Sequence, residues 1–226
     1  MRYHHRHYWV ARPAAVRPAA AYRQRTTRDQ RQAPFGPSET WYDPDQIPRL
    51  KIIVQPPGEG YWHPLTPQMI RDRLAQLPTE FAQAVKVVQL CQMTRKRALF
   101  PCYGMQWGQA VYLYPIEASL IETYLAPPRP QQVIEARMFG GRWIQQGKHW
   151  KLLWTEQSIR DFYLHNVLIH EVGHVLDQRN TNQTERERFA NWFAIEYGYR
   201  RHAEDRGENA PARGKIPSRG VIKCSC

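Results

Sequence analysis

The run VLIHEVGHVL, from Val167 to Leu176, limits the possible structures of this 226-residue chain more than any other segment. Its two histidines, His170 and His174, lie four residues apart, and residues at that spacing project from the same face of an α-helix. Both imidazoles can therefore reach one metal ion. Apart from the histidines and Glu171 the run is uncharged, as expected for a helix buried beneath a cleft. The run predicts a buried helix that offers a metal two ligands.

Glu171 lies one position after His170, so its carboxylate is expected beside the metal rather than on it. There it can take a proton from a water held at the metal and pass it to a leaving amine. Zinc suits this chemistry because it lowers the pKa of bound water to about 7. The competing interpretation is a core helix whose two histidines are satisfied by hydrogen bonds. Glu171 favours the enzyme, because a purely structural metal site has no use for a carboxylate at that position.

A catalytic zinc site needs a third protein ligand. A metzincin would supply a histidine at position 180 after a glycine at position 177, but this chain has Asp177 and Asn180 there. Asp177 is expected either to orient a ligand histidine or to cap the end of the helix. The next expected helix offers two other candidate ligands, Glu185 and Glu187.

Glu187 is the better candidate, because Asn191 lies four residues later on the same helical face and can hold a ligand histidine by a hydrogen bond. Glu185 is followed at that spacing by Phe189, which cannot do so. Glu187 also has a competing interpretation, as the capping-box residue of a helix with Thr184 as its N-cap.

The HEVGH run, a short connection and the string ERFANWFA at residues 187–194 together resemble the gluzincin branch of the zincin metallopeptidases. The E-x-x-A-N-x-F-A pattern is similar to the ImmA/IrrE family of compact intracellular metallopeptidases. The resemblance covers residues 167–195. It implies zinc bound by His170, His174 and Glu187, with Glu171 as the catalytic base. It also implies that the chain hydrolyses peptide bonds in a protein or peptide substrate.

The remaining patterns predict an α+β, zincin-like fold, in which a small twisted sheet packs on the HExxH helix and a second helix closes the metal site. Residues 81–91 fit a helix or a strand, and residues 104–108 a turn. Strands are expected at 51–55 and 110–114 and in a hairpin of 142–144 with 149–154. Helices are expected at 66–77, 116–125, 155–178 and 184–199. The expected N-caps are Thr66, Thr155 and Thr184.

The sequence leaves two further parts of the site undecided. An oxyanion-stabilising group is expected opposite the zinc, and Tyr163, Tyr197 and His202 are candidates. The strand at 110–114 is either an interior strand or an edge that binds an extended peptide by strand addition.

The net charge of +12 is concentrated at the two ends of the chain. Residues 1–32 hold eight Arg and one acid, and residues 200–226 hold seven Lys or Arg and three acids, which leaves +1 for residues 33–199. Arg-rich flexible ends attract polyanions weakly and in a salt-dependent way, so weak nucleic-acid contact and solvated arms are both consistent with them. We divide the chain into a basic, disordered N-terminal arm (1–48), a metallopeptidase-like domain (49–200) and a basic flexible tail (201–226).

Two other functional classes stay open. One is an inactive interaction protein with a structural zinc, closed by a fourth ligand such as His165 or His202. The other is a nucleic-acid-associated protein that acts through its Arg-rich ends. The sequence has no run of about 18 apolar residues and no apolar segment behind its basic N-terminus, so we expect a cytoplasmic protein without membrane contact. Cys91 and Cys102 are then expected to be buried thiols.

Overall fold

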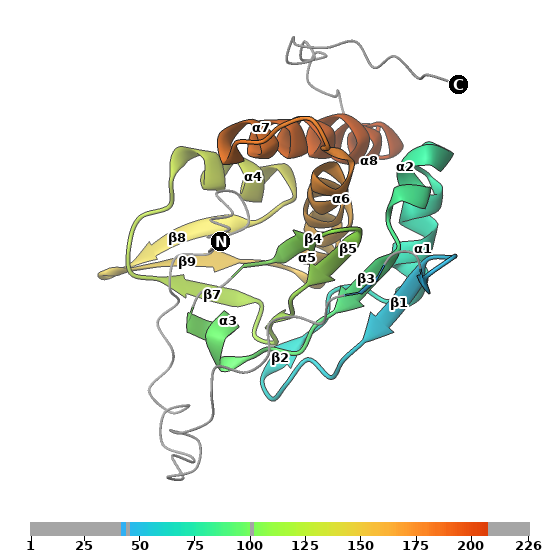
Figure 1. The fold of residues 1–226 in the computed structure, drawn as a ribbon. Coiled ribbons are helices and arrows are strands. Elements are labelled where there is room, and N and C mark those ends of the chain that lie inside the picture. Colours follow the sequence, from blue (N-terminus) through green and yellow to red (C-terminus); the bar gives the residue numbers. More distant parts are fainter. Residues whose placement is uncertain (1–41, 44–45, 100–101, 208–226) are drawn as a thin grey trace.

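The computed structural model describes residues 42–43, 46–99 and 102–207, which form the α+β fold expected from the sequence (Figure 1). The described strands form a four-stranded mixed sheet, a two-stranded sheet and a three-stranded antiparallel sheet. Most of the predicted N-terminal arm, and the tail beyond residue 207, lie outside the described residues.

The four-stranded sheet has the order β1 (Lys51–Val54), β3 (Val87–Leu90), β5 (Ala110–Leu113) and β4 (Gly104–Trp107). The first three strands run parallel, and β4 pairs antiparallel with β5 at one edge. Both β3 and β5 are buried along their whole length, as expected for interior strands. The strands predicted in these parts of the chain are confirmed.

Three details of this sheet differ from the predictions. Because β5 is interior, the peptide-binding edge proposed at residues 110–114 is wrong. The edge strand is β4, within the segment predicted as a turn; only Gly108, with a φ of 59°, and Gln109 form the turn. The ambiguous segment 81–91 holds both kinds of element, because α2 (Thr79–Ala84) ends before β3 begins.

The helix predicted at residues 116–125 is wrong. That segment forms β6 (Ile116–Glu117) and β7 (Ile121–Tyr124), which are separated by a bend where Leu120 has a φ of 58°. Tertiary contacts decide the outcome, because the buried Glu122 carboxylate on β7 accepts hydrogen bonds from Tyr103, Tyr124 and Trp154.

The predicted hairpin is confirmed as β8 (Arg142–Gln146) and β9 (His149–Leu153). Its second strand also pairs with β7, while β6 pairs with β2 (Tyr61–Trp62). Three other helices complete this half of the chain: α1 (Pro67–Ala75), α3 (Arg95–Leu99) and α4 (Pro130–Met138). Of these, α1 has the predicted N-cap, since the Met69 N–H donates to the Thr66 hydroxyl at 3.3 Å. The other two helices were not predicted, and α4 packs against β8 (Figure 1).

One continuous helix carries the HEVGH run. It consists of α5 (Glu156–Phe162), a π-helical segment η4 (Tyr163–Val167) and α6 (Leu168–Leu176). It begins as predicted, because the Ser158 N–H donates to the Thr155 hydroxyl at 3.1 Å and the Thr155 N–H donates to the Ser158 hydroxyl at 2.8 Å. Almost all of α6 is buried against β4, β5 and the helix that follows.

The following helix consists of α7 (Gln183–Phe193), a π-helical segment η5 (Ala194–Tyr199) and α8 (Arg200–Asp205). Its N-cap is Asn182 rather than the predicted Thr184, because the Asn182 side chain accepts from the Glu185 N–H at 2.9 Å. The domain boundary predicted at residue 200 falls inside this helix, since His202 and Ala203 are buried in the fold.

Within the described residues, no helix is long and apolar enough to cross a membrane. Cys91 and Cys102 are buried and are not joined in a disulfide, as expected.

Candidate metal centre

The site begins with a close crossing of α6 and α7. A β-carbon on Gly173 would lie 2.9 Å from the Ala190 Cα and 3.1 Å from the Phe193 Cβ, so only glycine fits there without movement. The crossing brings the middle of α7 against the face of α6 that carries the two histidines. Glu187 lies one turn before Ala190 and therefore reaches that face.

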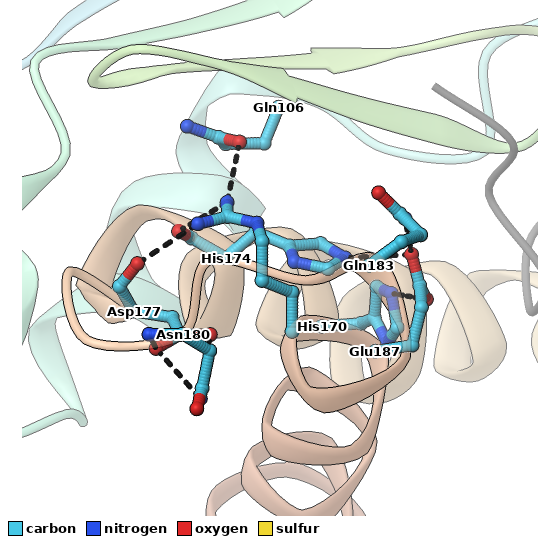
Figure 2. A network of polar contacts seen from close by, with 8 residues as sticks. Gln106, His170, His174, Asp177, Asn180, Gln183 and Glu187 are labelled. Atoms are coloured by element: carbon cyan, nitrogen blue, oxygen red, sulfur yellow. Dashed lines mark hydrogen bonds and ion pairs between the residues drawn. The ribbon is translucent and has the colours of Figure 1, made fainter. Parts of the chain in front are cut away.

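The side chains of His170, His174 and Glu187 converge as predicted (Figure 2). Each offers one ligand atom, and these atoms lie within 4.8 Å of one another. His170 Nε2 is 3.5 Å from Glu187 Oε2, and His174 Nε2 is 3.5 Å from Glu187 Oε1. The two imidazole rings are nearly perpendicular, at 85°. All three side chains are almost completely buried.

These distances fit a metal site better than a set of hydrogen bonds. A charge-assisted N–H···O bond is about 2.7–2.9 Å long. Two ligand atoms about 2.0–2.1 Å from a tetrahedral zinc ion lie roughly 3.3–3.4 Å apart. The separations of 3.5 Å are close to the second value. Two imidazoles and one carboxylate are also a ligand set that leaves catalytic zinc an open position.

Glu187, and not Glu185, faces the histidines. Glu185 is the third residue of α7 and pairs with Arg188 at 2.7 Å on the surface, where its side chain is 40% exposed. Glu187 is two positions further on than the capping-box position defined by Asn182, so the capping-box interpretation does not apply to it. Its Oε1 instead accepts a 2.6 Å hydrogen bond from Gln183, which fixes the carboxylate (Figure 2).

The protonation states suit metal binding. Burial lowers the pKa of His170 to about 4, against an opposing contribution from Glu187 and a weaker polar contact from Asn191. The imidazole is therefore neutral at neutral pH, which is the form that binds a metal. Burial alone would raise the pKa of Glu187, but its contacts with His170 and His174 hold it below the usual range.

Glu171 lies beside this group and against β4. It is fully buried, and neither carboxylate oxygen has a hydrogen-bond partner among the described residues. Burial, and to a lesser extent the charge of Glu187, raises the pKa of Glu171 well above its usual range. Leaving a carboxylate buried without partners is costly, and such groups gather at functional sites. Position 104 keeps this space open, since a β-carbon on Gly104 would lie 2.9 Å from Glu171 Oε1.

The outer edge of β4 presents backbone groups next to Glu171. The Tyr114 N–H donates to the Tyr103 carbonyl at 2.8 Å, so in this antiparallel register alternate residues bond to β5. Gly104 and Gln106 are the residues whose N–H and C=O groups point away from β5. Within the described residues β4 pairs with β5 alone. Gly104 is buried and Gln106 half-buried, so this edge becomes exposed only towards Trp107.

Arg186 connects three parts of the site. Its Nη1 donates to the Asp177 carbonyl at 2.9 Å, and its Nη2 lies 3.3 Å from the His174 carbonyl. The same Nη2 lies 3.4 Å from the side-chain oxygen of Gln106 on β4 (Figure 2). One side chain of α7 thus links the end of α6 to the edge strand.

The two predicted supporting residues behave differently. Asn191 lies near His170, but its Oδ1 and the His170 Nδ1 have no hydrogen-bond partner among the described residues, so the predicted hydrogen bond to a ligand histidine is not seen. Asp177 ends α6, and its carboxylate accepts from the Asn180 backbone at 3.2 Å and side chain at 2.9 Å. Asp177 and Asn180 lie at the left of Figure 2, and Glu187 lies at the right. The helix-capping alternative therefore describes Asp177, and the role of orienting a histidine is not seen.

The three candidate oxyanion stabilisers have other contacts. The Tyr163 hydroxyl donates to the Tyr114 carbonyl at 2.7 Å in the core. Tyr197 packs in an aromatic cluster with Phe81 and Phe193. His202 stacks on His165 instead.

Sequence reasoning missed Gly104, Gln106, Arg186 and Gln183. Of these, Gln183 alone carried a readable signal, because it precedes Glu187 by four residues on the same helical face. A cavity of about 310 Å³ between α4 and α7 was also not foreseen; Glu187, Asn191 and Glu135 are among the residues that line it.

Comparison of the chain with protein-family models, with curated proteins and with solved structures found no match in any of the three.

Proposed function

We propose that the protein is a zinc-dependent peptidase that uses Glu171 as its general base. The observation that carries this proposal is the convergence of His170, His174 and Glu187, with the buried Glu171 carboxyl beside them and facing β4. A structural zinc site would need a fourth ligand on the metal and would have no use for the Glu171 carboxyl beside it.

Zinc, when bound, makes water a nucleophile at neutral pH and polarises the carbonyl that is attacked. The chain itself supplies the proton transfer. Glu171 takes the proton of the attacking water and returns it to the amine that leaves. Burial raises the pKa of Glu171, which makes its carboxylate a stronger base than that of an exposed glutamate.

The substrate side of the proposal rests on β4. An extended peptide that pairs with the outward N–H and C=O groups of Gly104 and Gln106 would lie along α6 next to Glu171. Main-chain pairing positions a peptide bond without reading its sequence. The cavity between α4 and α7 gives one substrate side chain room beside Glu187.

The alternative of a closed structural site loses its support. It required a fourth ligand, and His165 and His202 were the candidates. Neither belongs to the group of ligand atoms around Glu187; both belong to a separate group with Asp161.

The deciding experiment compares wild-type protein with Glu171→Gln. Both are loaded with zinc, analysed for metal, and incubated with a mixture of peptides of varied sequence whose new termini are identified by mass spectrometry. We expect one zinc at this site in each protein and a rate that is lower by roughly 10²–10⁴-fold in the variant.

His170→Ala is the matched control for the metal. It should lose the zinc bound at this site, and with it the activity. Equal cleavage by wild-type protein and Glu171→Gln, or no cleavage by zinc-loaded wild-type protein, would argue against a peptidase.

A further inference from the structure

A second group of metal-ligating side chains lies away from the site around Glu187. Asp161, His165 and His202 each offer one ligand atom, and these atoms lie within 4.8 Å of one another. Asp161 and His202 are each only 8% exposed, and His165 is half-buried. The group combines two imidazoles with one carboxylate, as the first site does.

The local geometry brings these groups together from two helices. Asp161 on α5 and His165 on η4 are four residues apart along one continuous helix, so they share a face. His202 comes from α8, and its Nε2 lies 3.9 Å from Asp161 Oδ2. The rings of His165 and His202 stack with their centroids 4.4 Å apart and their planes at 25°.

A backbone contact holds the two helices at this distance. The π-helical segments η4 and η5 cross at Gly198, where a β-carbon would lie only 1.8 Å from the His165 carbonyl oxygen. His202 follows Gly198 by four residues and is thereby placed next to His165. Single π-helical turns inside α-helices are frequent at functional sites. This backbone contact therefore fixes how close His202 lies to His165.

We propose that Asp161, His165 and His202 bind a second divalent transition-metal ion, which is zinc or an ion with similar ligand preferences. Two imidazoles and a carboxylate suit zinc, and also iron and manganese. The Nδ1 atom of His165 is buried and has no hydrogen-bond partner among the described residues. A purely structural polar cluster would be expected to satisfy that atom.

The charges around the cluster predict how tightly it binds. Arg73 lies close enough to the cluster for its positive charge to act on His165. The same Arg73 cation repels a metal ion bound by the cluster. We therefore expect the second site to be the weaker one.

This proposal does not depend on peptidase activity, and the two sites share no ligand. It is tested on the full-length chain in a background where His4, His5, His7, Cys224 and Cys226 are replaced by Ala, so that the chain ends contribute no ligands. The protein is loaded with Zn²⁺, separated from unbound metal by gel filtration, and analysed for metal. We expect two equivalents, falling to one in Asp161→Asn and in His202→Gln.

Two controls separate the sites. His170→Ala in the same background should also hold one equivalent, and its combination with Asp161→Asn should hold none. Asp205→Asn changes an acid outside the ligand group on α8, the helix that carries His202, and should keep two equivalents. Fewer than two equivalents in the background protein, or two retained in both Asp161→Asn and His202→Gln, would overturn the proposal.

A second measurement covers the case in which these variants fail to fold. The metal-free background protein is titrated with Co²⁺ and followed by visible absorption, which reports ligand geometry. We expect two phases, the second at least about tenfold weaker than the first, as the neighbouring charges predict. Saturation at a single equivalent would exclude the second site.

Discussion

Gly173 on α6 lies so close to Ala190 on α7 that any side chain at residue 173 would press on the facing backbone, with 2.9 Å between the added β-carbon and the Ala190 Cα. The separation of the two helices, and with it the distance from Glu187 to the histidines, is set by backbone contact. A site defined in this way does not need the metal to assemble.

Gly173→Ala should therefore weaken both the fold and the metal site. Overpacking of this kind costs about 1–3 kcal/mol of unfolding free energy. Zinc affinity should fall as well, because Glu187 moves away from the histidines. Denaturant unfolding and zinc titration measure the two effects. Gly147→Ala, in the open turn between β8 and β9, is the control, and it should keep full zinc affinity. Unchanged zinc binding in Gly173→Ala would show that the crossing does not position Glu187.

Glu187→Ala and Glu185→Ala should differ sharply. The first removes a ligand, and its effect on zinc affinity should exceed the roughly 10–100-fold loss that follows removal of a supporting residue. The second removes only a surface partner of Arg188 and should leave zinc affinity unchanged. Competition with a chelator of known affinity measures both. The reverse pattern would mean that the ligand assignment is wrong.

Gly104→Ala should separate catalysis from metal binding. The added methyl group would lie 2.9 Å from Glu171 Oε1 and push the carboxyl from its place, and its three nearest contacts belong to Glu171 and Val167 rather than to a metal ligand. Displacement of a catalytic group by about 1 Å costs on the order of 100-fold in rate. We expect that loss with full zinc content, measured by peptide cleavage and elemental analysis on one preparation. A fully active Gly104→Ala protein would show that Glu171 acts from another position.

Arg186→Gln should lower the rate of peptide cleavage without removing the metal. Arg186 positions the edge strand against α6 through the Asp177 carbonyl and the Gln106 side chain, and touches no ligand side chain. A positioning role predicts a raised KM for peptides, because β4 is displaced, together with a smaller fall in kcat. Arg160→Gln is the control, because Arg160 lies on α5, pairs with Glu156 at 3.4 Å and touches neither β4 nor the cavity beside Glu187. Equal effects of the two variants on KM and kcat would show that Arg186 does not position β4.

Glu135→Gln should stabilise the protein increasingly at higher pH. Burial raises the pKa of Glu135 to about 9 from an ordinary value of 4.5. The folded protein keeps this proton while the unfolded chain releases it, so wild-type stability falls as the pH rises from about 4.5 to about 9. The neutral glutamine does not titrate. The unfolding free energies of the two proteins should differ little at pH 4 and most near pH 9, where the variant is the more stable. A difference that does not change with pH would mean that Glu135 is ionised in the folded protein.

Local signals in the sequence were sufficient for the start of the main helices and for the ligand spacing. Thr66 and Thr155 cap helices because the hydroxyl of each accepts a hydrogen bond from the backbone N–H three residues later. His170 and His174 share a face by helical geometry alone. Competition between adjacent polar residues was harder to judge: Asn182 caps α7, although Thr184 also fits a capping box.

The parts that depend on distant pairing could not be predicted. Residues 121–124 form a strand because Glu122 meets Tyr103 and Trp154, which lie far away in sequence. Gly104 and Gln106 gain their roles because β4 pairs with β5 at an edge over α6, and no pattern within β4 itself indicates this.

The alternation of β4 has a consequence for where a bound peptide would be cut. A strand that slips by one residue turns its side chains to the opposite face, whereas a slip of two residues restores the same pairing. Since Gly104 and Gln106 are the outward residues of this edge, a peptide of repetitive sequence should shift along it in steps of two. Its products would then differ in length by two residues, because the cut positions would all be odd-numbered or all be even-numbered.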